Sequence, residues 1–99
     1  MKVLVVFLAC AILTASAGHL ELCGYNTEEL SIVTTCIQLK ASVGLKASLL
    51  RIRLQLNCLN DVCMIQTLCG QGELVDVLPQ YLSDEEIVEL HDIAEECKP

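Results

Sequence analysis

The sequence has 99 residues, of which 54% are apolar and 3% aromatic, and its formal net charge at pH 7 is −7. A chain of this length predicts a single domain. Its acidic balance excludes long-range attraction to nucleic-acid phosphate or anionic lipid, so we expect neither a nucleic-acid-binding protein nor a cationic membrane-lysing peptide. The acidic residues gather between Asp84 and Glu96, which we interpret as a solvated face that keeps the protein soluble.

The N-terminal segment is typical of a secretory signal peptide. Lys2 precedes an apolar run over residues 3–13, and residues 15–17 read Ala-Ser-Ala, with small residues at both specificity positions of a cleavage site. The run, about eleven residues long, is too short for a transmembrane helix, which needs roughly twenty. We therefore expect residues 1–17 to be removed, leaving a secreted single domain of residues 18–99.

Six cysteines remain in that domain, because Cys10 is lost with the signal peptide. An even number of cysteines in a small secreted chain indicates disulfides, each stabilising the fold by roughly 2–4 kcal/mol. Zinc ligation is the alternative, but the chain has no Cys-x-x-Cys pair. The cysteines expected to form three disulfides are Cys23, Cys36, Cys58, Cys63, Cys69 and Cys97.

The pairing of these cysteines stays open at this point. If the first two helices form an antiparallel hairpin, Cys23 lies near Cys58 or Cys63, and Cys36 pairs elsewhere.

Asn26 or Thr27 can cap a first helix, and Glu29 completes a capping box. We expect Gly44 to break the helical pattern. The predicted apolar stripe of this helix consists of Leu30, Val33 and Ile37, widened by Ile32, Cys36 and Leu39.

A second helix is predicted from about Leu45 to Asn57, followed by a corner over residues 57–61. Its apolar side chains recur at spacings of four and three, so they share one face. The basic side chains Lys46, Arg51 and Arg53 avoid that face. The expected buried residues are Leu45, Leu49, Ile52, Leu56 and Leu59.

A short third helix is predicted over residues 61–69, ended by Gly70 and Gly72. Another short helix begins near Leu74 and is expected to stop near Pro79. The apolar residues of these two helices are Val62, Ile65 and Leu68, then Leu74, Val75, Val77 and Leu78.

The last helix has the clearest start signal. Ser83 is a suitable cap, Glu86 completes a capping box, and the acidic first turn suits the positive end of the helix dipole. Its expected inner stripe is Ile87, Leu90, Ala94 and Cys97. The predicted fold class is therefore all-α, a small disulfide-stapled bundle of about five helices.

Enzyme motifs are not found in the sequence. It has no Gly-rich phosphate loop, and its two histidines and paired cysteines offer no nucleophile, base and orienting group. We expect a protein that is not an enzyme.

The two histidines suggest a metal site instead. After the predicted cleavage the chain begins Gly18-His19, and the terminal amine, the peptide nitrogen of His19 and its imidazole fill three corners of a square plane. Square-planar nitrogen ligation is the preference of copper(II). His91 can supply the fourth ligand, with Asp92 or Glu95 as the acceptor for its other ring nitrogen. Cleavage after Gly18 instead places His19 first and changes the chelate.

The cysteine frame, with twelve, twenty-one, four, five and twenty-seven residues between successive cysteines, resembles that of the microplusin family. These are cysteine-rich antimicrobial proteins of ticks, and hebraein is a relative. Glu-Leu-Cys at residues 21–23, Gln-Leu-Asn-Cys-Leu-Asn at 55–60 and Leu-His-Asp at 90–92 add to the resemblance, which spans the whole predicted domain.

The resemblance implies a five-helix fold with three disulfides and chelation of copper(II), which starves microbes without lysing them. It also matches His19 and His91 to histidines of the family. Family members often carry a second N-terminal histidine and a histidine-rich tail, whereas residue 18 is glycine here and the sequence reads to Pro99. We therefore expect one copper site on a secreted monomer that binds no nucleic acid and does not insert into membranes.

Two other functions stay open on the same scaffold. One is a carrier of a small apolar ligand, like arthropod odorant-binding proteins, although their second and third cysteines lie much closer together. The other is an inhibitor or signalling ligand that acts through the acidic face. A saposin-like lipid-binding protein is a variant of this alternative, but this sequence lacks the Cys-x-x-Cys pair with which saposin-like proteins begin.

Overall fold

The structure is a computed structural model that describes residues 22–99. This part of the chain is helical and has no strand, which confirms the predicted all-α class. None of its helices is both long and apolar enough to cross a bilayer. The predicted signal peptide at residues 1–17 lies outside the described residues.

Six helical elements follow a helical turn at residues 22–24. They are α2 (Thr27–Lys40), α3 (Val43–Gln55), α4 (Asp61–Gln71), α5 (Leu74–Val77), the 3-10 helix η1 (Leu78–Gln80) and α6 (Asp84–Glu96).

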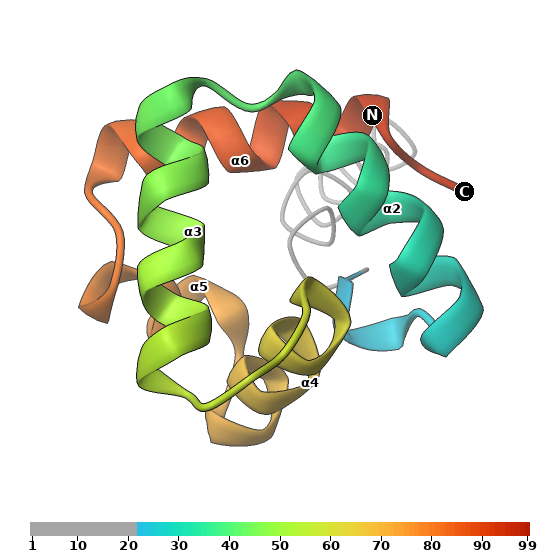
Figure 1. The fold of residues 1–99 in the computed structure, drawn as a ribbon, viewed down its shortest axis with the longest axis horizontal. Helices are drawn as coiled ribbons and strands as arrows, with labels where there is room; N and C mark the ends of the chain where they lie inside the picture. The colour runs from blue at the N-terminus through green and yellow to red at the C-terminus, as the bar shows by residue number, and fades with distance from the viewer. Residues whose placement is uncertain (1–21) are drawn as a thin grey trace, which may run out of the picture.

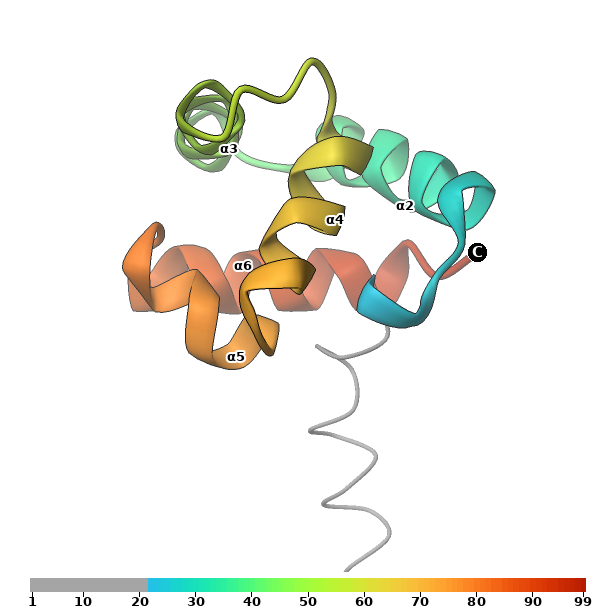
Figure 2. The same cartoon turned by 90° about the horizontal axis from the view of Figure 1, so that it is seen from below.

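The helices form two layers joined by α4. Helices α2 and α3 lie on one side, α5 and α6 on the other, and α4 crosses between them (Figure 2). Helix α6 runs across one end of the bundle and packs against both α2 and α3, and α4 does the same at the other end (Figure 1). Helices α2 and α3 are not among the helix pairs that pack closely, so the condition on which Cys23 was placed near Cys58 or Cys63 is not met, and Cys23 bonds to Cys69.

Each long helix starts at a side chain that accepts a hydrogen bond from the first turn. The predicted capping box of α2 is confirmed, with Asn26 and Glu29 each accepting a hydrogen bond from the other's backbone N–H. Ser42 caps α3, with its Oγ accepting from Leu45 N–H at 3.2 Å. The break between these helices therefore lies at residues 41–42, and the expected break at Gly44 is wrong, since Gly44 lies in the first turn of α3.

The corner after α3 differs from the prediction. The helix ends at Gln55, and Asn57 adopts φ 56°, in the left-handed region, which redirects the chain. Leu59 is consequently 91% exposed, and its expected place in the core is wrong. Arg53 holds the corner from α3, because its guanidinium donates to the Leu59 carbonyl oxygen and its Nε lies 3.7 Å from Asp61 Oδ1.

The expected apolar stripe of α2 is too wide. Leu30, Val33 and Ile37 are buried as predicted, but Ile32 is 58% and Leu39 80% exposed. These two positions lie about half a turn away from the buried side chains, so they point to solvent. The most deeply buried side chains of the core are Leu30, Val33, Leu45, Ile52, Met64, Leu68 and Leu74.

The short connections after α4 follow the glycine and proline pattern with small shifts. Gly72, at φ 145°, is the residue that ends α4, whereas Gly70 lies inside the helix. Helix α5 ends at Val77, close to Pro79 as expected, and Pro79 itself sits in the first turn of η1, where a missing backbone N–H costs nothing.

Three disulfides join the helices, as expected. Cys23 bonds to Cys69 on α4, and Cys36 on α2 bonds to Cys97, the residue that caps the end of α6. These two bonds connect positions 46 and 61 residues apart in the sequence. They therefore tie both ends of α2 to other parts of the bundle.

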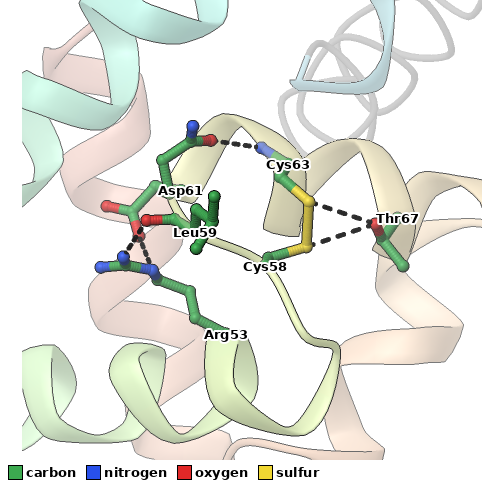
Figure 3. Close-up of a disulfide and its surroundings, with 7 residues drawn as sticks. Arg53, Cys58, Leu59, Asp61, Cys63 and Thr67 are labelled. Atoms are coloured by element: carbon green, nitrogen blue, oxygen red, sulfur yellow. Dashed lines mark hydrogen bonds and ion pairs between the residues drawn. A yellow bond between two sulfur atoms is a disulfide. The ribbon is translucent and has the colours of Figure 1, made fainter.

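The third disulfide, Cys58–Cys63, closes the corner that leads into α4 (Figure 3). Thr67 Oγ1 lies 3.6 Å from Cys58 Sγ and 4.0 Å from Cys63 Sγ. Asn60 caps α4 by accepting a hydrogen bond from Cys63 N–H at 2.8 Å. A short covalent loop and a helix cap thus fix the same turn.

The sequence separations predict unequal contributions of the disulfides to stability. In the loop-entropy description, replacing Cys36 and Cys97 by serine lowers the free energy of unfolding by about 4 kcal/mol, and replacing Cys58 and Cys63 lowers it by about 2 kcal/mol. The first bond spans 61 residues and the second only 5. Urea unfolding followed by circular dichroism measures both, and an equal or reversed ranking would contradict the prediction.

Candidate metal site on the last helix

Helix α6 carries His91 and begins as the sequence predicts. Ser83 Oγ accepts a hydrogen bond from Glu86 N–H at 3.2 Å, and Glu86 Oε1 accepts from Ser83 N–H at 3.0 Å. Acidic residues fill the first turn, where the helix dipole stabilises negative charge. Leu90 and Cys97 are buried as expected, and Ile93 joins them in the core.

Carboxylates of α6 hold the start and the middle of the helix against α3. Glu86 accepts a short hydrogen bond from the hydroxyl of the buried Ser48. Glu89 accepts from Ser42 N–H at 2.8 Å and from Ser42 Oγ–H at 2.9 Å. Ser42 therefore caps α3 and binds α6 at the same time.

The end of α6 is held against α2. The Cys36–Cys97 disulfide closes it covalently, and Lys40 Nζ lies 3.0 Å from Glu96 Oε2. Sequence reasoning missed the positioning roles of Ser42, Ser48 and Glu89, because their partners are distant in sequence and no local pattern marks them.

The hydrogen bonds at the start of α6 change the acidity of one carboxyl. Hydrogen bonds hold the pKa of Glu86 below its ordinary value of 4.5. The hydroxyl of Ser48 has the largest effect and the backbone N–H of Ser83 the next, and the positive charge of Arg51 acts in the same direction. Glu86 is therefore ionised at neutral pH, as its acceptor role requires.

His91 lies at the edge of the core with its two ring nitrogens beside carboxylates. Its side chain is 29% exposed, Nδ1 lies 3.6 Å from Asp92 Oδ1, and Nε2 lies 3.7 Å from Glu95 Oε1. Nε2 is shielded from solvent. Lys98 Nζ approaches the second oxygen of Glu95 at 3.0 Å. The two acceptors expected from the sequence thus both lie near the imidazole.

The other two candidate ligands, Gly18 and His19, lie outside the described residues. Within residues 22–99 no group of three or more histidine, cysteine, aspartate or glutamate side chains is arranged to hold a metal ion. The six cysteines from Cys23 to Cys97 are all in disulfides, so none of them is a thiolate that could bind zinc. Of the three predicted ligands, the structure therefore places His91 alone.

A shallow pocket of about 380 Å³ lies between α2 and the corner before α4, away from His91. Gln38 Nε2 donates to Asp61 Oδ2 at 2.9 Å across it. Its polar wall differs from the mostly apolar lining of sites that enclose small apolar ligands, so it does not support a carrier function. The lining residues are Ser31, Thr34, Thr35, Gln38, Arg53, Asn60, Asp61 and Val62.

The Ser48–Glu86 bond generates a prediction about acid stability. A lowered pKa means that the ionised carboxyl stabilises the fold fully above pH 4.5 and that this contribution is lost as the pH falls through the folded-state pKa. Ser48→Ala should raise the pKa of Glu86 towards its ordinary value, whereas Ser31→Ala on the exposed side of α2 should leave it unchanged. Titration of the Glu86 carboxyl by NMR measures the pKa, and an unaltered value in Ser48→Ala would contradict the assignment.

Comparisons with known proteins agree on one family. A family model described as "Microplusin antimicrobial peptide" matches residues 23–97. No solved structure matches the chain. Three relatives are named antimicrobial peptide microplusin. The one from Argas monolakensis is 37% identical, and the match covers 100% of this chain and 89% of the relative. The relative from Rhipicephalus microplus is 35% identical over 87% of this chain and 78% of its own length, and the one from Ixodes scapularis is 33% identical over 91% of this chain and 74% of its own length.

The family match covers the whole stapled bundle, from the first cysteine of the disulfide frame to the last. His91 and the helix that carries it lie inside the matched range. The chain therefore belongs to the microplusin family of antimicrobial peptides.

Proposed function

We propose that this protein is secreted and antimicrobial, and that it acts by chelating copper(II) and withholding it from microbes. The family match and three relatives named as antimicrobial peptides support the antimicrobial role. Disulfides are typical of oxidising, extracellular compartments, which supports secretion.

The position of His91 is the observation that carries the metal proposal. It is one of two histidines in the chain, and it lies on a helix held at its start, middle and end by other parts of the bundle. An imidazole held in this way loses little conformational freedom on binding a metal, which favours affinity.

We assign Nδ1 of His91 as the metal-binding nitrogen. Nε2 is shielded from solvent and lies beside Glu95, an arrangement in which the carboxylate orients the ring and leaves Nδ1 as the nitrogen that faces outward to a metal. The remaining ligands of the proposal are the terminal amine of Gly18 and the peptide nitrogen and imidazole of His19, which complete a square plane of nitrogens.

The carboxylates around His91 support binding of a cation. Asp92 and Glu95 lie beside the imidazole, and Lys98 is the neighbouring positive charge. A surface rich in one sign of charge raises the local concentration of counter-ions. The acidic residues of α6 are Asp84, Glu85, Glu86, Glu89, Asp92, Glu95 and Glu96.

Copper titration of the mature, secreted protein tests the proposal. One equivalent of copper(II) should bind with submicromolar affinity at about pH 7.4 and much more weakly at about pH 5, because protons compete for the amine and both imidazoles. His91→Gln should weaken binding by at least about tenfold, as should one residue added before Gly18. Glu85→Gln, an exposed change on the same helix, should bind like the wild type.

Microbial growth links the site to the biological role. Inhibition of growth by the protein should disappear when equimolar copper(II) is added to the medium, and His91→Gln should inhibit weakly. Absence of submicromolar binding at neutral pH, or full affinity in His91→Gln, would refute the proposed site; inhibition that added copper does not reverse would refute the mechanism.

A further inference from the structure

The pocket between α2 and the corner before α4, which we call the polar pocket, is lined by side chains that the fold holds in place. Figure 3 shows Arg53 reaching from α3 to the corner and to Asp61. Gln38 reaches Asp61 from α2, with Nε2 donating to Oδ2 at 2.9 Å. The Cys58–Cys63 disulfide closes the same corner. These side chains therefore lose little further conformational freedom when a ligand binds.

One wall of the polar pocket contains a salt bridge whose hydrogen bonds are incomplete. Arg53 Nε and Asp61 Oδ1 lie 3.7 Å apart, beyond the range of a hydrogen bond, and both atoms are buried without a hydrogen-bond partner among the described residues. Most buried polar groups in folded proteins have a partner in the protein or in ordered water. The two side chains keep 27% and 12% of their surface exposed. This wall therefore has hydrogen-bonding capacity that the protein itself does not use.

The α2 side of the polar pocket offers hydrogen-bond acceptors. Thr34 Oγ1 donates to the Ser31 carbonyl oxygen at 3.3 Å, and Thr35 Oγ1 donates to the same oxygen at 2.8 Å. Because each hydroxyl hydrogen is used within the helix, the two hydroxyl oxygens are left as acceptors. All three residues line the pocket. A ligand that binds this side must therefore donate hydrogen bonds.

The charges of the polar pocket disfavour ionic ligands. Asp61 repels an anion, and Arg53 repels a cation. Because these two side chains lie beside each other, their charges offset and neither sign of ligand is selected. A neutral hydroxyl group both donates and accepts a hydrogen bond, so it suits a pocket that combines acceptor oxygens with a guanidinium.

We propose that the polar pocket binds one neutral sugar ring, either free or at the end of a glycan. The pocket volume of about 380 Å³ is at the small end of ligand sites, which measure about 300–1,000 Å³. A single sugar ring presents several hydroxyls on a small frame, and Val62 in the pocket lining offers an apolar contact for its C–H groups. Because the pocket is shallow, a ring that continues into a glycan chain can also enter it.

Sugar binding at this pocket is independent of copper chelation. The described residues that line the pocket belong to α2, α3 and the start of α4, whereas His91 lies on α6. Sugar binding needs neither the metal nor the N-terminal residues of the proposed copper site. Either proposal can therefore fail while the other stands.

Titration with single sugars, followed in amide NMR spectra with a metal chelator present, tests the proposal on the mature protein. The probes are glucose, mannose, galactose and N-acetylglucosamine. At least one should bind with a Kd of about 1–10 mM, as expected for so small a ligand, and shift the amides of residues 31–38 and 60–62. No saturable shift with any probe up to about 50 mM, or shifts confined to other residues, would overturn the proposal.

Charged forms of the same ring test the choice of a neutral ligand. The uronate and the amino sugar that correspond to the bound ring should each bind at least about fivefold more weakly, because one meets Asp61 and the other Arg53. Equal or tighter binding of either charged form would contradict the proposal.

Matched variants locate the site. Thr35→Val keeps the shape of the side chain but removes its hydroxyl, and Gln38→Ala removes the amide beside Asp61. Each should weaken sugar binding at least about fivefold. Thr27→Val and Gln80→Ala make the same changes at exposed positions outside the pocket and should stay within about twofold. Circular dichroism checks that each variant is folded. Equal loss in the controls, or full affinity in both pocket variants, would overturn the assignment.

Beads that carry a neutral polysaccharide ending in the bound ring separate the two sources of the sugar. Retention that the free sugar reverses would support binding of a terminal ring on a glycan. Binding of the free sugar without retention on the beads would support a free monosaccharide as the ligand. Retention that Gln38→Ala leaves unchanged would count against the polar pocket as the site.

Discussion

The bond between Cys36 and Cys97 is the constraint on which the arrangement of the bundle depends most. It joins α2 to the end of α6 across 61 residues of sequence. Because the two helices are neither adjacent in sequence nor joined by a sheet, chain connectivity alone does not place them side by side. With that bond closed, the hydrogen bonds from Glu89 to Ser42 and from Glu86 to Ser48 fix the rest of α6 on α3.

The same arrangement separates the most acidic helix from the most basic one. Helix α6, which carries seven acidic residues, lies in one layer, and α3, which contains Lys46, Arg51 and Arg53 and no acidic residue, lies in the other (Figure 2). The net charge of the sequence therefore describes neither helix. Few aromatic residues are needed for such a scaffold, since leucine, valine, isoleucine and methionine fill the core and disulfides supply much of the remaining stability.

Local signals were readable from the sequence, and long-range ones were not. Asn26 and Ser83 are identifiable as caps because their partners lie three residues away, and the neighbours of His91 follow from helical spacing alone. Leu59 was misplaced because its periodicity continues that of α3 while the left-handed Asn57 turns the chain. Disulfide pairing and the anchors of α6 depend on the packing of distant segments, which spacing does not encode.

The central claim is that His91 and the N-terminal residues bind the same copper ion. Paramagnetic copper(II) broadens the NMR signals of nearby nuclei, so the amide spectrum of the mature protein tests this claim directly. Substoichiometric copper should broaden the amides of residues 19–22 and of the α6 segment around His91 together. Broadening confined to the N-terminal residues, with the signals around His91 unchanged, would contradict the account.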